Sequence, residues 1–218
     1  MKQLMPPSSG SVMDCTYSRN RFGQYIRKRA TPVNPGTVAQ VNQRARMTTN
    51  AAAWRALTDA QRAGWLSLGL MISRTDALGQ VYTLNGFGAY CSVNNNNLDA
   101  GNAAVSAAPA LTTPLDLATA TITLTAAAFS VAYTATPLAA GVRLFIFCSP
   151  QRSAGRSFEG DYRLIAVTAA AAASPANILT AYTAKFGVPV VGNRIFLKLE
   201  TYQLGFKSSP FAVSQVVV

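Results

Sequence analysis

The sequence contains no histidine, so it lacks the side chain that most often serves as a general base near neutral pH. The same absence removes the Ser-His-Asp and Cys-His arrangements of nucleophilic catalysis and the commonest metal ligand. Of the eight acidic residues, only Glu159 and Asp161 are close in sequence, and Arg156 and Arg163 beside them indicate ion pairs in a turn. We therefore predict a protein that is not an enzyme, with no catalytic residues, no cofactor and no metal site.

Cysteine and long apolar runs are also scarce. The three cysteines, Cys15, Cys91 and Cys148, lie far apart and are odd in number, which excludes a disulfide framework and a CxxC metal knuckle. No run approaches the roughly 20 apolar residues that span a bilayer, and the first residues lack the apolar core of a signal peptide. We expect no membrane partner and assembly in the cytoplasm.

Charged residues make up only 12% of the chain, about half the usual fraction of a soluble domain. The 19 basic residues, most of them arginine, exceed the 8 acidic ones and give a net charge of +11. Arginine pairs bidentately with carboxylates and phosphates and tolerates burial better than lysine, so this bias favours fixed interfaces or phosphate contacts. A surface with so little charge is expected to be partly covered by partners.

Residues 1–36 are predicted to form an extended arm, because prolines punctuate the segment and its middle alternates cations with aromatic rings. Such a segment builds no core alone. It can lie across a partner protein, across nucleic acid or back on its own domain, and we place the protein partner first. The predicted contact residues of the arm are Arg19, Arg21, Phe22, Tyr25, Arg27, Lys28 and Arg29.

Residues 37–101 are predicted to form a helical domain. Apolar residues at helical spacing predict a helix of about five turns from residue 38. A capping box at Thr58 and Gln61 predicts the start of a second helix, and Phe87 to Leu98 fit a third. Four consecutive asparagines, 94–97, are poor helix formers, so either this helix ends early or partners hold their amides.

Residues 102–117, rich in Ala, Pro, Thr and Ser, are predicted to be a linker. Beyond it, residues 118–218 show the period-two alternation and spacing of a β-sandwich. Strands are expected at 119–125, 129–133, 143–148, 162–167, 194–200 and 211–218, with a short helix at 175–186. The fold class is therefore α+β: an extended arm and small helical segment, followed by an antiparallel sandwich of the fibronectin-III or immunoglobulin type.

Further arginines extend the predicted partner interface. Arg152 and Arg156 lie in a Ser- and Gly-containing loop between two strands, where they can hold a phosphate or a partner's carboxylate. Arg44 and Arg46 lie on the first predicted helix, where they add to the charge of the arm. The alternative for the loop is a merely solvated turn.

Several strings of residues resemble a known family. They are Arg19–Tyr25, Pro32–Pro35 with Thr37 and Gln40, Trp54–Thr58 with Gln61, Arg62 and Trp65, Gly155–Ser157, Ala181–Gly187 and Arg194–Phe196. In these the chain resembles proteins encoded by phages, prophages and some bacteria, often beside virion genes. The resemblance implies a capsid decoration, cement, head-completion or tail component. Its partners would be major capsid or tail proteins and further copies of itself, and its location the virion.

We thus expect a virion structural protein that assembles in many copies through its N-terminal arm. A nucleic-acid-binding protein that uses the same basic residues is the first alternative. An extracellular adhesion or carbohydrate-binding module is the second, and it rests only on the predicted sandwich, a fold that serves many functions.

Overall fold

The computed structural model describes residues 9–31, 33–75, 79–134 and 136–218. The chain divides into two compact units, residues 1–44 and residues 45–218. This division differs from the expected one, because the helices and the sandwich belong to a single unit instead of being separated by a linker. We describe each unit by itself.

The first unit contains a three-stranded antiparallel sheet in the order β1-β2-β3, formed by Gly10–Val12, Cys15–Asn20 and Gly23–Lys28. The turn between β2 and β3 is closed by Asn20, whose side-chain oxygen accepts a hydrogen bond from the amide of Phe22 at 2.9 Å. The expected extended arm is thus a folded sheet over this stretch. Tyr, Thr and Ile at its strand positions suit a pleated surface, and Asn suits the turn.

Helix α1 (Val38–Ala56) begins in the first unit and ends in the second. Its start is capped by Thr37, whose hydroxyl accepts from the amide of Gln40 at 3.4 Å while the Gln40 side chain accepts from the amide of Thr37 at 3.3 Å. This reciprocal pair is a capping box, which satisfies two backbone donors that a helix start leaves unpaired. It confirms the predicted beginning of the helix.

Helices α2 (Asp59–Met71) and α3 (Gly86–Asp99) complete the helical part, together with a hairpin of β4 (Ser73–Thr75) and β5 (Val81–Thr83). The predicted capping box at Thr58 and Gln61 is present and opens α2. The core is aromatic: the ring of Tyr90 lies 5.5 Å from that of Trp54 and 5.1 Å from that of Trp65. Both tryptophans are therefore core anchors.

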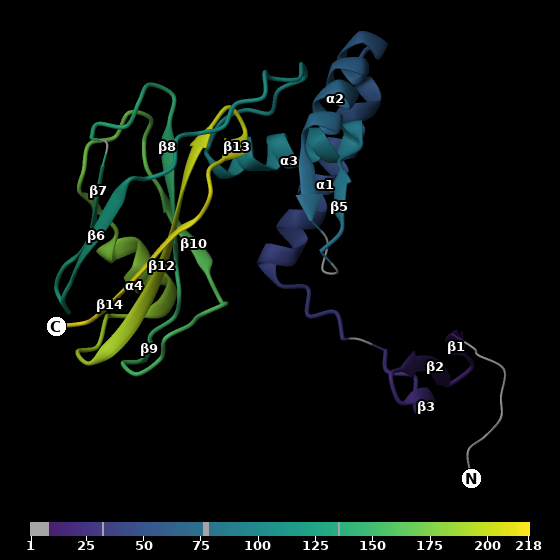
Figure 1. The fold of residues 1–218 in the computed structure, drawn as a ribbon, viewed down its shortest axis with the longest axis horizontal. Helices are drawn as coiled ribbons and strands as arrows, with labels where there is room; N and C mark the ends of the chain where they lie inside the picture. Colours follow the sequence, from purple (N-terminus) through teal and green to yellow (C-terminus); the bar gives the residue numbers. More distant parts are fainter. Residues whose placement is uncertain (1–8, 32, 76–78, 135) are drawn as a thin grey trace. The chain divides into compact units, whose positions relative to one another are not determined.

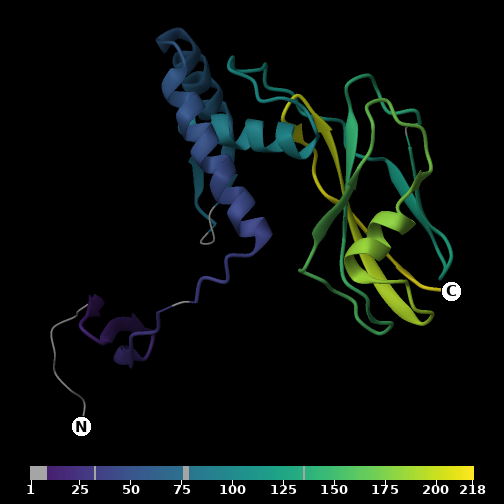
Figure 2. The same ribbon diagram turned by 180° about the vertical axis from the view of Figure 1, so that it is seen from behind.

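Two antiparallel sheets form the rest of the second unit (Figures 1 and 2). The smaller sheet has the order β11-β7-β6, with β11 Ala176–Asn177, β7 Phe129–Thr134 and β6 Thr119–Leu124. The larger one is built around the long strand β12 (Asn193–Gln203). Its other strands are β8 Arg143–Cys148, β9 Arg152–Ser153, β10 Arg163–Val167, β13 Phe206–Lys207 and β14 Phe211–Val216.

The inward residues of both sheets share one core. Phe129 and Val131 of β7 pack with Leu144 and Ile146 of β8 and with Leu197 of β12, all fully buried. Helix α4 (Leu179–Phe186) adds Tyr182, whose hydroxyl donates to the carbonyl of Ser149 at 3.2 Å. These contacts confirm the predicted α+β class and its antiparallel, sandwich-like second half.

Residues 102–117 pack on both the helices and the sheets instead of forming a free linker. The indole of Trp65 donates to the carbonyl of Ser106 at 2.7 Å, and Asn94 exchanges two hydrogen bonds with the backbone of Val105. At the other end, the hydroxyl of Thr201 donates to the carbonyl of Leu115 at 2.7 Å. The prolines exclude regular structure here, but side chains outside the segment satisfy its backbone groups.

The four asparagines lie inside α3, and each amide has a partner within the chain. Asn94 binds Val105, Asn95 accepts from Asn50 of α1, Asn96 donates to the carbonyl of Gly205, and Asn97 accepts from the hydroxyl of Tyr202. Consecutive helical residues point in directions about 100° apart, so one run reaches four different elements. Accordingly α3 lies between the other helices and the sheets in both ribbon views (Figures 1 and 2). None of the described helices is long and apolar enough to cross a bilayer.

Candidate partner interface

The sheet of the first unit has two chemically different faces. Residues paired across adjacent strands share a face, so Tyr17 lies beside Ile26 and Cys15 beside Val12 and Lys28. This face, which we call the apolar sheet face, comprises Val12, Cys15, Tyr17 and Ile26, with Arg19 and Lys28 on the same side at its two ends. It combines an apolar centre with cations at its margin, as protein interfaces do.

The opposite face of the sheet is polar. It carries Thr16, Ser18, Tyr25 and Arg27, which the strand register places on the side away from Ile26. At the tip, the guanidinium of Arg21 stacks over the ring of Phe22 at 4.6 Å, and that ring is 81% exposed. The polar face offers solvated groups, so it needs no covering partner.

The apolar sheet face is open to solvent. Val12 is 61% and Ile26 is 45% exposed, and no described residue of the sheet is buried. A three-stranded sheet needs a covered apolar face for independent stability, and burial of apolar area is the dominant favourable term. Its one described ion pair, between Lys28 and Asp14 at 4.0 Å, is highly exposed and adds little.

Charge is concentrated in the first unit. Its 44 residues hold seven basic side chains against one acidic side chain, a net charge of +6, whereas the 174 residues of the second unit hold twelve against seven. The predicted contact residues of the arm are all exposed there: Arg19, Arg21, Phe22, Tyr25, Arg27, Lys28 and Arg29. The structure thus gathers these seven on or beside one small sheet.

The four other arginines of the predicted interface are not part of that sheet, and each makes contacts within the chain. Arg44 donates to the side-chain oxygen of Asn34 at 2.9 Å, and Arg46 forms an ion pair of 2.6 Å with Asp99. Arg152 binds the carboxylate of Glu159, and Arg156 lies 3.5 Å from its other oxygen. The ion pairs that the sequence indicated around Glu159 and Asp161 are present, with Arg156 3.5 Å from Glu159 and Arg163 3.5 Å from Asp161. The sequence did not indicate the pairing of Arg46 with Asp99, which lies 53 positions away.

Glu159 organises the loop that carries Arg152 and Arg156. Its side chain is only 2% exposed, and it accepts hydrogen bonds from the amides of Gly160 and Asp161 at 2.8 and 2.9 Å. The bond from the Asp161 amide and that from Arg152 lower the pKa of Glu159 from its ordinary value to about 2. The arginines of this loop are therefore held in ion pairs within the chain, where Arg152, Arg156 and Arg163 face the carboxylates of Glu159 and Asp161.

Sequence reasoning missed a second group of cations, on the outward face of the larger sheet. Lys198 pairs with Glu200 at 2.9 Å, and its ammonium lies 4.6 Å from the ring of Phe147. Lys207 lies 4.5 Å from the ring of Phe145. The alternation in Arg143–Cys148 could have indicated that Phe145 and Phe147 share one face. The contacts of these rings with Lys198 of β12 and Lys207 of β13 depend on the fold.

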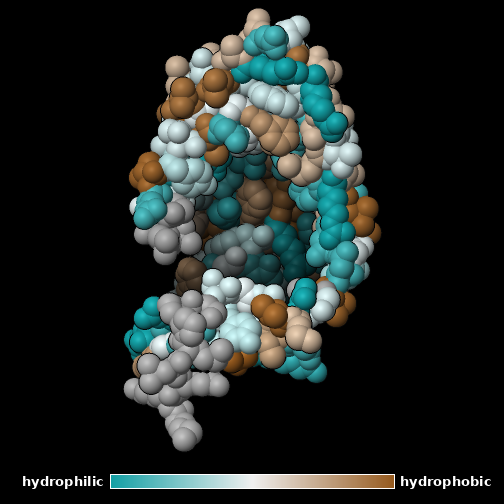
Figure 3. All heavy atoms as spheres, turned by 90° about the vertical axis from the view of Figure 1, so that its right-hand side faces the viewer, coloured by the Kyte–Doolittle hydropathy of each residue, from teal (hydrophilic) through white to brown (hydrophobic). Residues whose placement is uncertain are grey.

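Exposed apolar side chains also occur on the second unit, where Leu66, Leu70 and Met71 of α2 and Val81 of β5 are more than half exposed. On the face drawn in Figure 3, however, apolar side chains lie in small groups among polar ones. Single exposed apolar residues are normal on folded proteins. That face therefore shows no continuous apolar surface.

Among the described residues, no group of three or more Cys, Asp or Glu side chains is placed to hold a metal ion. Comparison with family models, curated proteins and solved structures finds no match for this chain.

Proposed function

We propose that the protein is a structural component of a bacteriophage particle, which attaches through its N-terminal sheet and works without catalysis. The observation that carries this proposal is the open apolar sheet face, with Arg19 and Lys28 at its margin, on a sheet without a buried side chain. Its partner would be a neighbouring capsid or tail protein with an apolar patch and acidic residues around it.

In this proposal the second unit is the folded body of the component, and the first unit attaches it to the particle. Seven of its strands form two sheets. Strands β6, β7 and β11, which are the first, second and fifth of the seven in chain order, form one sheet, and β8, β10, β12 and β14 belong to the other. This arrangement of two antiparallel sheets supports a fibronectin-III-like sandwich, an architecture common in cell-surface domains. Because one fold can serve many functions, the proposal rests on the apolar sheet face and not on the sandwich.

The proposal is tested by deleting residues 1–36, which removes the sheet and keeps the capping box of α1. The truncated chain should fold with an unchanged melting temperature and lose its incorporation into particles. Both chains would be expressed with the structural genes encoded beside them, and particles would be purified and assayed for the protein. Normal incorporation of the truncated chain would contradict the proposed function.

Nucleic acid is the second candidate partner, because Arg21, Phe22 and Tyr25 expose cations and rings together near the tip of the sheet. Each phosphate contact would contribute roughly one unit to the slope of log affinity against log salt concentration. A steep slope with single-stranded and double-stranded DNA would favour this candidate. Binding that is absent, or insensitive to salt, would remove it.

A further inference from the structure

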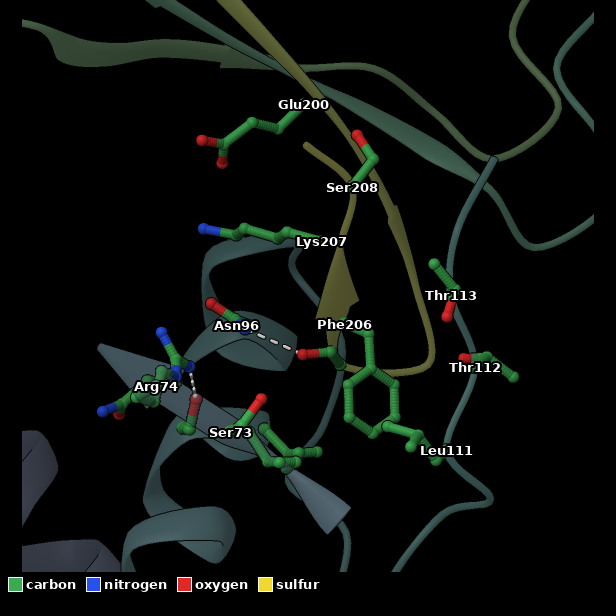
Figure 4. Close-up of a pocket in the computed structure, with 15 residues that line it drawn as sticks. Ser73, Arg74, Asn96, Leu111, Thr112, Thr113, Glu200, Phe206, Lys207 and Ser208 are labelled. Carbon is green, nitrogen blue, oxygen red and sulfur yellow. Dashed lines mark hydrogen bonds between the residues drawn. The ribbon is translucent and has the colours of Figure 1, made fainter. Parts of the chain in front are cut away.

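The second unit contains a cavity of about 740 Å³ that the attachment role does not use. It lies between β4, α3, the segment 111–113 and the turn that joins β12 to β13. Figure 4 shows the guanidinium of Arg74, the carboxylate of Glu200 and the ammonium of Lys207 extending to the same side from three different strands. Two cations and one anion therefore face one polar space.

Lys207 is the most informative of these groups. Its ammonium lies over the rings of Phe145 and Phe147, at 4.5 and 5.6 Å, and burial lowers its pKa. The two carboxylates whose charges act on it are already paired, Glu200 with Lys198 at 2.9 Å and Asp99 with Arg46 at 2.6 Å. An external anion would add the close negative partner that a half-buried ammonium requires.

Arg74 supplies a second cation to the same space. It donates to the hydroxyl of Ser92 at 3.1 Å, which fixes its direction along α3. Asn96 is likewise fixed, because its side-chain nitrogen donates to the carbonyl of Gly205 at 2.7 Å. Its side-chain oxygen points to the same side as the charged ends of Lys207 and Arg74 (Figure 4). Preorganised side chains of this kind bind a ligand without first paying the cost of being ordered.

The remaining lining suits a ligand that carries hydroxyl groups. Ser73, Asn95 and Thr113 add neutral donors and acceptors, and the ring of Phe206 forms an apolar wall.

We propose that this cavity binds a small anionic polyol, a sugar-sized molecule with one carboxylate or one phosphate group. Lys207 and Arg74 bind its charge, and the amide and hydroxyl groups bind its hydroxyls. The volume lies within the range of small-molecule sites. Sugar acids and sugar phosphates both combine one anionic group with several hydroxyls. A comparison of their affinities for the protein distinguishes them.

The test is an NMR titration of the full-length ¹⁵N-labelled protein with glucuronate and with glucose 6-phosphate. At least one of them should shift amides of β4, α3 and β13 saturably, and bind more tightly than glucose, acetate or inorganic phosphate. K207M should weaken the binding about tenfold, since it removes a charge-assisted contact but keeps an unbranched side chain only one atom shorter. K28M, the same change on the N-terminal sheet, should leave the affinity unchanged.

Glu200→Gln separates a binding role from a structural one. Removing this carboxylate reduces the repulsion of an anion, so the variant should bind the anionic sugar several-fold more tightly, whereas a poorly folded variant would bind more weakly. The proposal is overturned if neither anionic sugar binds, or if K207M retains full affinity. It is also overturned if acetate or inorganic phosphate binds as tightly as the sugars, which would mark an ion site without recognition of hydroxyls.

Discussion

The three cysteines differ in their surroundings, which decides their reactivity. Cys148 is fully buried in the sandwich core, and burial raises its pKa to about 12. Cys91 is buried in the helical core, and burial raises its pKa as well, whereas Cys15 is partly exposed on the N-terminal sheet. Only a thiolate on an accessible sulfur reacts rapidly.

We therefore expect a thiol-reactive disulfide reagent at pH 8 to modify one cysteine per folded chain and all three in denaturant. Mass spectrometry of the modified protein should place the single label on Cys15. Rapid labelling of Cys148 in the folded protein would contradict the core that we describe. C15S offers the matched control, and its folded form should take up no label.

Glu159 makes stability depend on pH in a specific window. Its pKa is lowered to about 2, so its contribution is fully present above its unfolded pKa, near 4.3, and is lost as the pH falls toward 2. E159Q should melt at a lower temperature than the parent at pH 7, and the difference should shrink steadily between about pH 4.5 and 2. A difference in melting temperature that is constant over this range would contradict the assigned contacts.

At the scale of elements, the turn between β12 and β13 controls how closely the sheets approach α3. Gly205 has a φ of +90°, and a Cβ added there would meet Cγ1 of Val93 in α3 at 2.4 Å. Gly192 has a similar φ of +87° but open space around it. The pair separates the cost of an unfavourable backbone conformation from that of a steric clash.

G192A should destabilise the protein by about 1–2 kcal/mol, the cost of a left-handed conformation with a side chain. G205A should cost at least about 2 kcal/mol more, because the added methyl must displace α3 or its own turn. Urea unfolding monitored by tryptophan fluorescence gives both values. Equal losses in the two variants would show that α3 and the turn are not in contact.

The elements themselves were predictable where local chemistry specifies them. The capping box at Thr58 and the apolar spacing from residue 38 located two helix starts, and period-two alternation located most strands of the sandwich within a few residues. The N-terminal sheet was missed because prolines and arginines near its strands suggested an extended segment. For residues 94–97 the sequence left two alternatives, and the structure confirms the one in which partners hold the amides. The sequence could not identify these partners because they are distant: Asn96 binds Gly205, 109 positions away.

The candidate interface was predictable only in part, for a related reason. A run of exposed cations marked the first unit correctly as the charged part of the chain. The sequence did not show that Arg46 is paired with Asp99, so Arg46 was grouped with the arm. Arg152 and Arg156 were included as well, although Arg156 lies beside the acidic pair with which the sequence indicated ion pairs. Nor did it reveal the cavity at Lys207, whose lining comes from four separate segments.

At the scale of the whole molecule, the protein consists of a folded body and a small three-stranded sheet near its N-terminus. The body has its own aromatic and aliphatic cores, whereas the sheet lacks a buried side chain in the part that is described. Folding of the body therefore does not require the sheet, whereas the sheet has no core of its own. The central proposal is that a partner covers its apolar face.

The most direct test compares two single substitutions on opposite faces of the sheet. I26E places a charge on the apolar sheet face, and S18E places the same charge on the polar face. Copies of each variant per purified particle are counted by quantitative mass spectrometry. We predict that I26E lowers incorporation at least about tenfold, because a partner-covered charge is costly, while S18E keeps it near the parental level. Equal incorporation of the two variants would contradict the claim.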